Sequence, residues 1–173
     1  MTTKTIKKNN ETTQSDIKIK TVLFICVHNS GRSQMAEAIF NHLAQGKARA
    51  ISAGTRPAAH TDRNVVGAMK EIGIDIRSQR PKALTIEMIE AADRIVTMGC
   101  GAAETCPASF VPSEDWQLDD PEGRSLEEVR IIRDTIRTHV EKLVGEVLGA
   151  FPENHGGPPH NKEQKRNITW RIQ

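Results

Sequence analysis

Apolar and polar positions in this 173-residue chain form blocks that predict strands followed by helices. The first block is the apolar run over residues 22–25, whose β-branched and aromatic side chains are typical of a buried strand. Residues 35–43 follow with apolar side chains at helical spacing. The short stretch between the two contains Ser30 and Gly31, which favour a tight loop. The segment is therefore predicted to run strand, loop, helix.

The later blocks continue the alternation of strands and helices. They predict, in order, a strand over 49–53, a helix capped by Thr61 and ended by Gly73, a short helix beginning at Thr85, a strand over 94–98 and a shorter strand over 114–118. Ser125, with Glu128 three residues later, forms a capping box that begins a long amphipathic helix. Such alternation indicates an α/β domain in which helices flank a parallel sheet.

The loop after the first strand carries the chain's most reactive residues. Cys26 ends the predicted strand, and Arg32 and Ser33 precede the helix. A loop at a helix N-terminus directs backbone N–H groups at one point, where the helix dipole adds partial positive charge. An oxyanion fits such a loop, and the guanidinium of Arg32 can bind two of its oxygens. The same field favours the thiolate of Cys26, a candidate nucleophile; a buried structural cysteine is the alternative.

Charge is distributed unevenly along the chain. The net charge of +2 is made up of +3 in residues 1–20, +2 in residues 151–173 and therefore −3 between them. A nucleic acid partner is thus not indicated. The polar residues 1–18 predict a disordered basic arm, and residues 151–173 predict a flexible tail. A single domain is expected over residues 19–150.

The chain shows no sign of a membrane or export segment. No apolar run approaches ~20 residues, and the N-terminal stretch lacks the apolar core of a secretory signal. We therefore expect a cytoplasmic protein. In that compartment its three cysteines are more typical of catalysis or metal binding than of structural disulfides.

The sequence of residues 26–38, CVHNSGRSQMAEA, resembles the phosphate-binding loop of the low-molecular-weight protein tyrosine phosphatase superfamily. Within that superfamily it most resembles the thioredoxin-coupled arsenate reductases. The resemblance implies a phosphatase-I-like fold with a four-stranded parallel sheet. It implies arsenate as substrate, phosphate or sulfate as its mimics, and thioredoxin as reductant, with no bound cofactor. The oxyanion-binding loop would consist of Cys26, Val27, His28, Asn29, Ser30, Gly31, Arg32 and Ser33.

Two further cysteines, Cys100 and Cys106, follow the strand predicted over residues 94–98. If this strand and the first are parallel neighbours, Cys100 begins near Cys26 on one rim of the sheet. Three thiols on one rim permit a relay by disulfide exchange. Inert buried thiols are one alternative. Zinc is the other, but zinc sites prefer cysteine pairs two to four residues apart with further ligands, so no metal site is expected.

The resemblance assigns a role to each cysteine of this pair. In the reductases that the chain resembles, the first attacks the sulfur of the nucleophile and releases arsenite, and the second resolves the disulfide. Cys100 would be the attacker and Cys106 the resolving thiol. The staphylococcal-type pattern has six residues between the two, whereas this chain has five. A shorter or rearranged redox segment is therefore expected.

A candidate general acid follows the last predicted strand. Displacement at an oxyanion requires a proton for the departing oxygen, which a carboxylic acid above the site can supply. Asp119 and Asp120 precede Pro121, although carboxylates at this position can simply begin a turn. The resemblance places the acid directly before the proline, which implies Asp120, with Asp119 as the alternate. The phosphatases usually follow this proline with aromatic residues. Glu122 and Gly123 stand here instead, which favours a small inorganic oxyanion.

Some members of the superfamily bind potassium beside the loop. Asn29, Glu37 and Ser52 match ligand positions, whereas the fourth position falls on Lys82. Because the ammonium group can replace the cation, no potassium site is expected. The resemblance also implies that Asn29 and Ser33 shape the loop and hydrogen-bond the nucleophile.

The sequence thus predicts a cytoplasmic arsenate reductase for arsenic detoxification. The predicted catalytic residues are Cys26, Arg32, Cys100, Cys106 and Asp120. The alternatives are a phosphatase of the same superfamily, a mycothiol- or glutaredoxin-coupled reductase, and a redox-responsive anion-binding module without turnover. The expected partners are arsenate and thioredoxin, with neither nucleic acid nor membrane.

Overall fold

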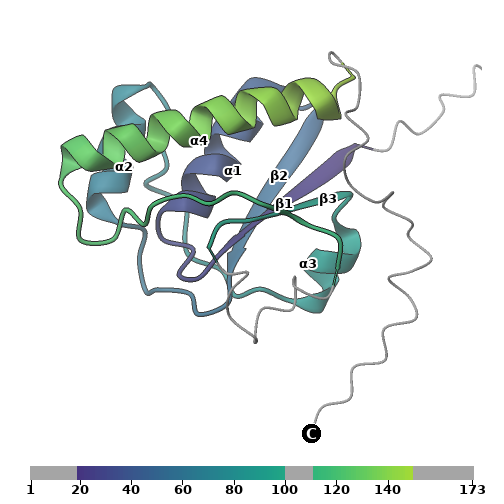
Figure 1. Ribbon diagram of the computed structural model, residues 1–173, viewed down its shortest axis with the longest axis horizontal. Helices are drawn as coiled ribbons and strands as arrows, with labels where there is room; N and C mark the ends of the chain where they lie inside the picture. Colours follow the sequence, from purple (N-terminus) through teal and green to yellow (C-terminus); the bar gives the residue numbers. More distant parts are fainter. Residues whose placement is uncertain (1–18, 100–110, 150–173) are drawn as a thin grey trace, which may run out of the picture.

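A computed structural model describes residues 19–99 and 111–149; the predicted arm and tail lie outside these ranges. Its centre is a parallel sheet of four strands in the order β2-β1-β3-β4 (Figure 1). The strands are β1 (Lys20–Cys26), β2 (Ala48–Gly54), β3 (Arg94–Thr97) and β4 (Glu114–Asp115). The prediction of an α/β fold with a four-stranded parallel sheet is confirmed.

Helices lie on both faces of the sheet. On one face are α1 (Arg32–Ala44), α2 (Arg63–Glu71) and the long α4 (Leu126–Val147), which crosses the other two in Figure 1. The short helix α3 (Ile86–Ala91) covers the opposite face. The central strand β1 is therefore apolar on both sides. Phe24 points into the larger cluster and Ile25 into the smaller one, which accounts for its continuous apolar run.

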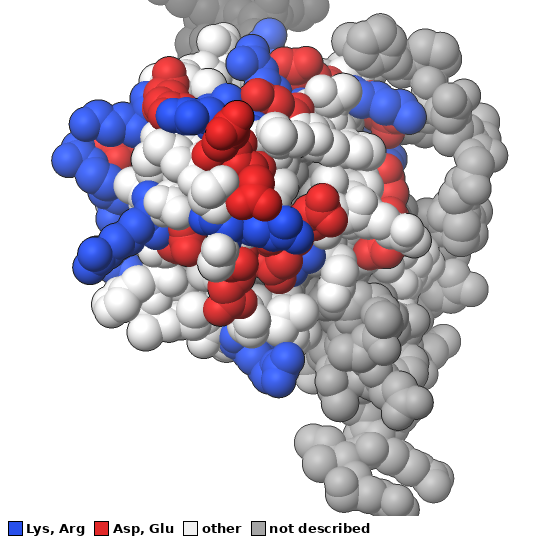
Figure 2. Space-filling model, turned by 60° about the vertical axis from the view of Figure 1, so that its left-hand side comes forward, with Lys and Arg blue, Asp and Glu red and all other residues white. Residues whose placement is uncertain are grey.

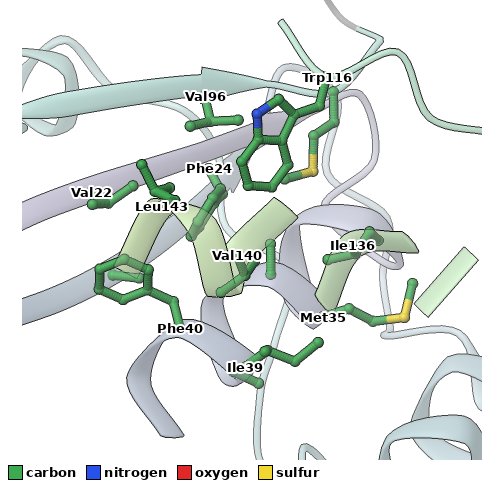
Figure 3. Close-up of a cluster of buried hydrophobic side chains, with 14 of the residues drawn as sticks. Val22, Phe24, Met35, Ile39, Phe40, Val96, Trp116, Ile136, Val140 and Leu143 are labelled. Carbon is green, nitrogen blue, oxygen red and sulfur yellow. The ribbon is translucent and has the colours of Figure 1, made fainter. Parts of the chain in front are cut away.

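The larger core packs aromatic residues from three parts of the chain against α1 and α4 (Figure 3). The ring centroids of Phe24 and Phe40 are 6.1 Å apart in an edge-to-face arrangement, and Trp116 lies 5.7 Å from Phe24. Val140 and Leu143 of α4 are buried against the same cluster. This packing holds α1 firmly on the sheet, and with it the loop that joins α1 to β1.

The helix starts follow the sequence signals with one exception. The Ser125 hydroxyl accepts a hydrogen bond from the backbone N–H of Glu128 and the Glu128 carboxylate accepts one in return, so the predicted capping box is confirmed. Thr85 caps α3 as predicted. The prediction that Thr61 caps α2 was wrong. Asp62 is the cap, because the Thr61 hydroxyl donates to the carbonyl of Gln79 instead.

The strands β3 and β4 are shorter than predicted. β3 ends at Thr97 rather than residue 98, and β4 spans two residues instead of reaching residue 118. The backbone N–H of the next residue, Trp116, still bonds to the Thr97 carbonyl, 2.8 Å away. Two residues later the Leu118 carbonyl accepts a hydrogen bond from Arg32 of α1, which draws the chain away from the sheet. The chain beyond Trp116 then leaves the sheet and passes toward the loop after β1.

Acidic and basic side chains lie beside one another on the face shown in Figure 2. Between α2 and α4, Glu71 pairs with both Arg130 and Arg133. The hydrogen bond from Arg130 is the main cause that lowers the pKa of Glu71, and Arg133 adds to it. Among the described residues, no helix is both long enough and apolar enough to cross a membrane.

Candidate active site

The loop between β1 and α1, here called the anion loop (residues 26–33), is held from outside by the segment after β2. Backbone N–H groups of Thr55, Arg56, Ala58 and Asp62 donate to the loop carbonyls of residues 26, 27, 28 and 30, over 2.9–3.3 Å. Because these carbonyl oxygens are taken up by donors outside the loop, they do not repel an anion inside it. The helix N-terminus that follows at Arg32 adds partial positive charge.

The thiol of Cys26 is buried and has two polar partners within the loop. Its Sγ lies 2.9 Å from the Ser33 hydroxyl and accepts a hydrogen bond of 3.2 Å from the backbone N–H of Asn29. Both groups that contact the sulfur belong to the anion loop itself. The expected hydrogen bonds from Ser33 and Asn29 to Cys26 are thus present in the structure.

Asn29 is the residue on which the shape of the loop depends. Its φ of 47° is left-handed, a conformation that asparagine tolerates better than most residues. Its side-chain amide donates to Ser33 and to Ser52, at 2.7 and 2.9 Å, and its Oδ1 accepts from the backbone of Lys82. The buried side chain of Gln34 donates to both oxygens of Asn29. Asn29 thus ties the loop to the strand and loop beside it.

The residues matched to potassium ligands come together as expected from the sequence. Ser52 donates to the Glu37 carboxylate and accepts from Asn29. The ammonium of Lys82 lies 3.0 Å from the same Glu37 oxygen and supplies positive charge at this cluster. The Glu37 side chain is 14 % exposed, so Lys82 neutralises a carboxylate that has little water around it.

Arg32 joins the anion loop to the segment that carries the predicted acid, here called the acid loop (residues 118–122). Its Nη2 lies 2.5 Å from Asp120 Oδ2, and its Nη1 donates to the Leu118 carbonyl at 3.3 Å. The guanidinium is almost buried, whereas the Asp120 side chain is 47 % exposed. Of the two candidate carboxylates, Asp120 is therefore the one that contacts Arg32.

Two more residues of the acid loop, Pro121 and Glu122, also contact the anion loop. Pro121 packs so closely on Gly31 that a Cβ added to Gly31 would lie 2.4 Å from the Pro121 ring. One residue further, Glu122 Oε2 lies 3.0 Å from His28 Nδ1. Three consecutive acid-loop residues, 120–122, thus contact three residues of the anion loop. Sequence reasoning missed these last two contacts, because no local pattern links residues about 90 positions apart.

The strand order confirms the neighbour relation on which the cysteine relay depends. β1 pairs with β3, and the backbone N–H of Met98 donates to the Ile25 carbonyl, so β3 ends beside Cys26. Gly99 then approaches Arg32 so closely that a Cβ there would lie 2.8 Å from Nη1. Gly99 directly precedes Cys100 in the sequence. Cys100 and Cys106 themselves lie outside the described residues.

Arg124, just before α4, interacts with the carboxylates of the acid loop and of the first turn of α4. The hydrogen bond to Glu128 raises the pKa of Arg124, and the charges of Asp119 and Asp120 add to this effect. Within residues 19–99 and 111–149, no group of three or more His, Cys, Asp or Glu side chains is arranged to hold a metal ion.

Comparison with known proteins identifies the family. The profile of the low molecular weight phosphotyrosine protein phosphatases matches residues 21–150, which is the sheet, both loops and all four helices described above. The chain belongs to this family. Its fold is the one that the family shares.

Two curated relatives in this family carry a more specific name. A protein named arsenate reductase from Brevibacillus brevis is 38 % identical over 127 residues, which cover 72 % of this chain and 93 % of the relative. A protein named glutaredoxin arsenate reductase from Synechocystis is 34 % identical over 132 residues, which cover 75 % of this chain and 99 % of the relative.

Two solved structures that resemble this chain carry the names of different activities. A thioredoxin-dependent arsenate reductase from Corynebacterium glutamicum is 33 % identical with a TM-score of 0.63; the match covers 77 % of this chain but only 63 % of that one. An arginine phosphatase from Geobacillus stearothermophilus is 25 % identical with a TM-score of 0.68. The match covers 79 % of this chain and 97 % of the phosphatase.

Proposed function

We propose that this protein is an arsenate reductase that uses a relay of three cysteines and takes its electrons from thioredoxin. The observation that carries the proposal is the arrangement of a hydrogen-bonded thiol, a buried guanidinium and a carboxylate around one anion loop. The names of two relatives, 34 % and 38 % identical to the chain, support arsenate as the oxyanion. Such thiol chemistry suits the reducing environment of the cytoplasm.

The first step forms a bond between the Cys26 sulfur and arsenic. Arsenate enters the anion loop, where its oxygens meet backbone N–H groups and Arg32. The Cys26 thiolate attacks arsenic, an arsenic–oxygen bond breaks, and Asp120 in its protonated form gives the departing oxygen a proton, so that water leaves. Arsenic remains pentavalent at this stage. In the structure Asp120 is paired with Arg32. When arsenate binds, it replaces Asp120 as the partner of Arg32, and this frees Asp120 to act as the acid.

The second step reduces the arsenic. The Cys100 thiolate attacks the Cys26 sulfur, and the sulfur–arsenic bond breaks with its electron pair going to arsenic, which leaves as trivalent arsenite. Cys26 and Cys100 are then joined by a disulfide. The Cys106 thiolate attacks the sulfur of Cys100 and frees Cys26. The position of Gly99 against Arg32 supports this route, because the chain approaches the anion loop just before Cys100.

Thioredoxin is proposed as the reductant of the Cys100–Cys106 disulfide. The thioredoxin-dependent neighbour from Corynebacterium supports this choice. The relative from Synechocystis named for glutaredoxin supports the alternative, in which a glutaredoxin or a small thiol such as mycothiol reduces the enzyme. A protein with three cysteines can complete its relay internally and present a disulfide to a dithiol donor, which favours thioredoxin.

Phosphatase activity is the second candidate function. The family is named for it, and the arginine phosphatase from Geobacillus has the same fold. Phosphate has the shape and charge of arsenate, and the first displacement is common to both reactions. Weak hydrolysis of phosphate esters by the same Cys26, Arg32 and Asp120 is therefore expected alongside reduction.

The relay is tested by a Cys106→Ser variant mixed with arsenate in the absence of external reductant and then in its presence. We expect a single turnover, with arsenite equal to the enzyme added, and no steady turnover with thioredoxin. Cys26→Ser is the control and should produce no arsenite. Sustained turnover by Cys106→Ser would overturn the role given to Cys106.

A further inference from the structure

A pair of side chains joins the anion loop to the acid loop at a point that the reaction described above does not use. His28 Nδ1 lies 3.0 Å from Glu122 Oε2, with side-chain exposures of 36 % and 67 %. We propose that this bridge, called here the His28–Glu122 bridge, makes the site select inorganic oxyanions over oxyanions that carry an organic substituent. The inference rests on the proposed function and deepens it by naming what defines the substrate class.

The chemistry of displacement fixes where a substituent must lie. The attacking sulfur and the departing oxygen stand on opposite sides of the central atom, so an ester group points away from Cys26. The general acid must be within hydrogen-bond reach of that oxygen. With Asp120 as the acid, the substituent of an ester extends past Asp120. Glu122 follows two residues later and contacts His28 of the anion loop, so the inference places the bridge beside this exit.

The acid loop has little freedom to move aside for such a group. The Pro121 ring is buried against Gly31, and Arg32 Nη1 donates to the Leu118 carbonyl. Neither contact uses the Asp120 carboxylate, which an incoming anion displaces from Arg32. Glu122 is thereby kept next to His28 by its own neighbours in the chain. An ester therefore meets the bridge in place, rather than an open groove.

The bridge affects the two classes of anion differently. An inorganic oxyanion presents only oxygens at the exit, and these remain hydrated. An organic group must either separate His28 from Glu122 or lie against a charged carboxylate and strip water from it, and both cost free energy without a new polar partner. Exposed salt bridges change equilibria by up to about fivefold, and this exposed contact is expected to act on the same scale.

The test compares the affinities of inorganic phosphate and phenylphosphonate for the reduced protein by isothermal titration calorimetry. Phenylphosphonate has the same anionic head but a ring in place of one oxygen, and it is not hydrolysed. The variants are Glu122→Ala, His28→Ala and the double variant. Glu90→Ala, which removes an exposed carboxylate on α3, is the matched control.

We expect the preference for phosphate, taken as the ratio of the two dissociation constants, to fall about three- to fivefold in each single variant and no further in the double variant. Removing the negative charge of Glu122 strengthens the binding of both anions, and this general effect cancels in the ratio. Glu90→Ala should keep the wild-type ratio.

An unchanged ratio in both single variants would overturn the inference, as would independent falls that add in the double variant. Because the measurement uses neither arsenate nor a reductant, it stands apart from the proposed function. Failure to reduce arsenate would refute the reductase proposal and leave the binding ratio intact. A ratio that does not move would refute the bridge and leave the reductase proposal intact.

Discussion

A methyl group at Gly31 should separate the acid loop from the anion loop. The Cβ of an alanine at this position would lie 2.4 Å from Pro121 Cγ, whereas carbon atoms in contact are about 3.5–4.0 Å apart. The two loops would therefore have to part by roughly 1 Å or more. The five-membered ring fixes φ and leaves Cγ only the small movement of its pucker, so most of the separation must come from the loops. Asp120 precedes Pro121 and would move with it, away from Arg32.

The size of the effect follows from the role given to Asp120. Displacing a catalytic group by about 1 Å costs on the order of 100-fold in rate, and a general acid contributes about 10²–10⁴ in all. We therefore expect kcat/KM for arsenate to fall about 100-fold in Gly31→Ala. Overpacking should cost about 1–3 kcal/mol of stability, which leaves the protein folded. Phosphate affinity should change little, because the loop keeps its backbone N–H groups and Arg32.

The assay is steady-state arsenate reduction, with phosphate affinity measured in parallel. Gly67→Ala is the matched control, since a Cβ there would make only an ordinary contact of 3.7 Å with Leu126. If Gly31→Ala acts through Asp120, adding Gly31→Ala to Asp120→Asn should cause little further loss. Activity close to wild type in Gly31→Ala, or a double variant about 100-fold below Asp120→Asn, would refute the reasoning.

Two further predictions concern the scaffold around the site. In Lys82→Met the Glu37 carboxylate loses its cation, which should lower the free energy of unfolding, measured with urea, by about 1–3 kcal/mol. Potassium at fixed ionic strength should stabilise this variant but not the wild type. The control Lys142→Met should show neither the lower stability nor the response to potassium. Glu128 has a pKa lowered to about 2 from 4.5 by the backbone N–H of Ser125, with help from Arg124. Its charge therefore stabilises the folded state fully above pH 4.5, and this contribution is lost as pH falls toward 2. The melting temperature of wild type should exceed that of Glu128→Gln at pH 7, and the gap should close over this range.

Each of these predictions has an outcome that contradicts it. Potassium-dependent stabilisation of the wild type would mean that Lys82 does not stand in for a cation. A gap in melting temperature that stays constant from pH 7 to pH 2 would mean that the Glu128 charge contributes nothing to stability. Asp75 also has a pKa lowered to about 2, by Arg77. Because Asp75 is present in both wild type and Glu128→Gln, its contribution cancels from the difference in melting temperature.

The parts of the fold that sequence predicted are those set by local chemistry. The apolar run of β1, the capping box at Ser125 and the Thr85 cap each depend on residues within a few positions of one another. The Cys26–Ser33 contact was also within reach, because both residues lie in one short loop.

The features that sequence could not supply depend on contacts between distant segments. The start of α2 was misplaced because Thr61 bonds to residue 79. β4 is short because the Leu118 carbonyl accepts from Arg32, far away in the sequence. The seating of Pro121 on Gly31 and the bond between His28 and Glu122 follow from tertiary packing alone. Sequence reasoning placed these residues in two separate loops, and no local pattern pairs them with one another.

The most direct test of the account is NADPH oxidation in the presence of thioredoxin, thioredoxin reductase and this protein, with arsenate added as substrate and phosphate as control. The account predicts oxidation that depends on arsenate, is absent with phosphate, and disappears in Cys26→Ser and Cys100→Ser. Replacing thioredoxin with glutaredoxin and glutathione in a parallel reaction identifies the preferred donor. No oxidation with either donor, together with brisk hydrolysis of an aryl phosphate, would contradict the account and make this family member a phosphatase.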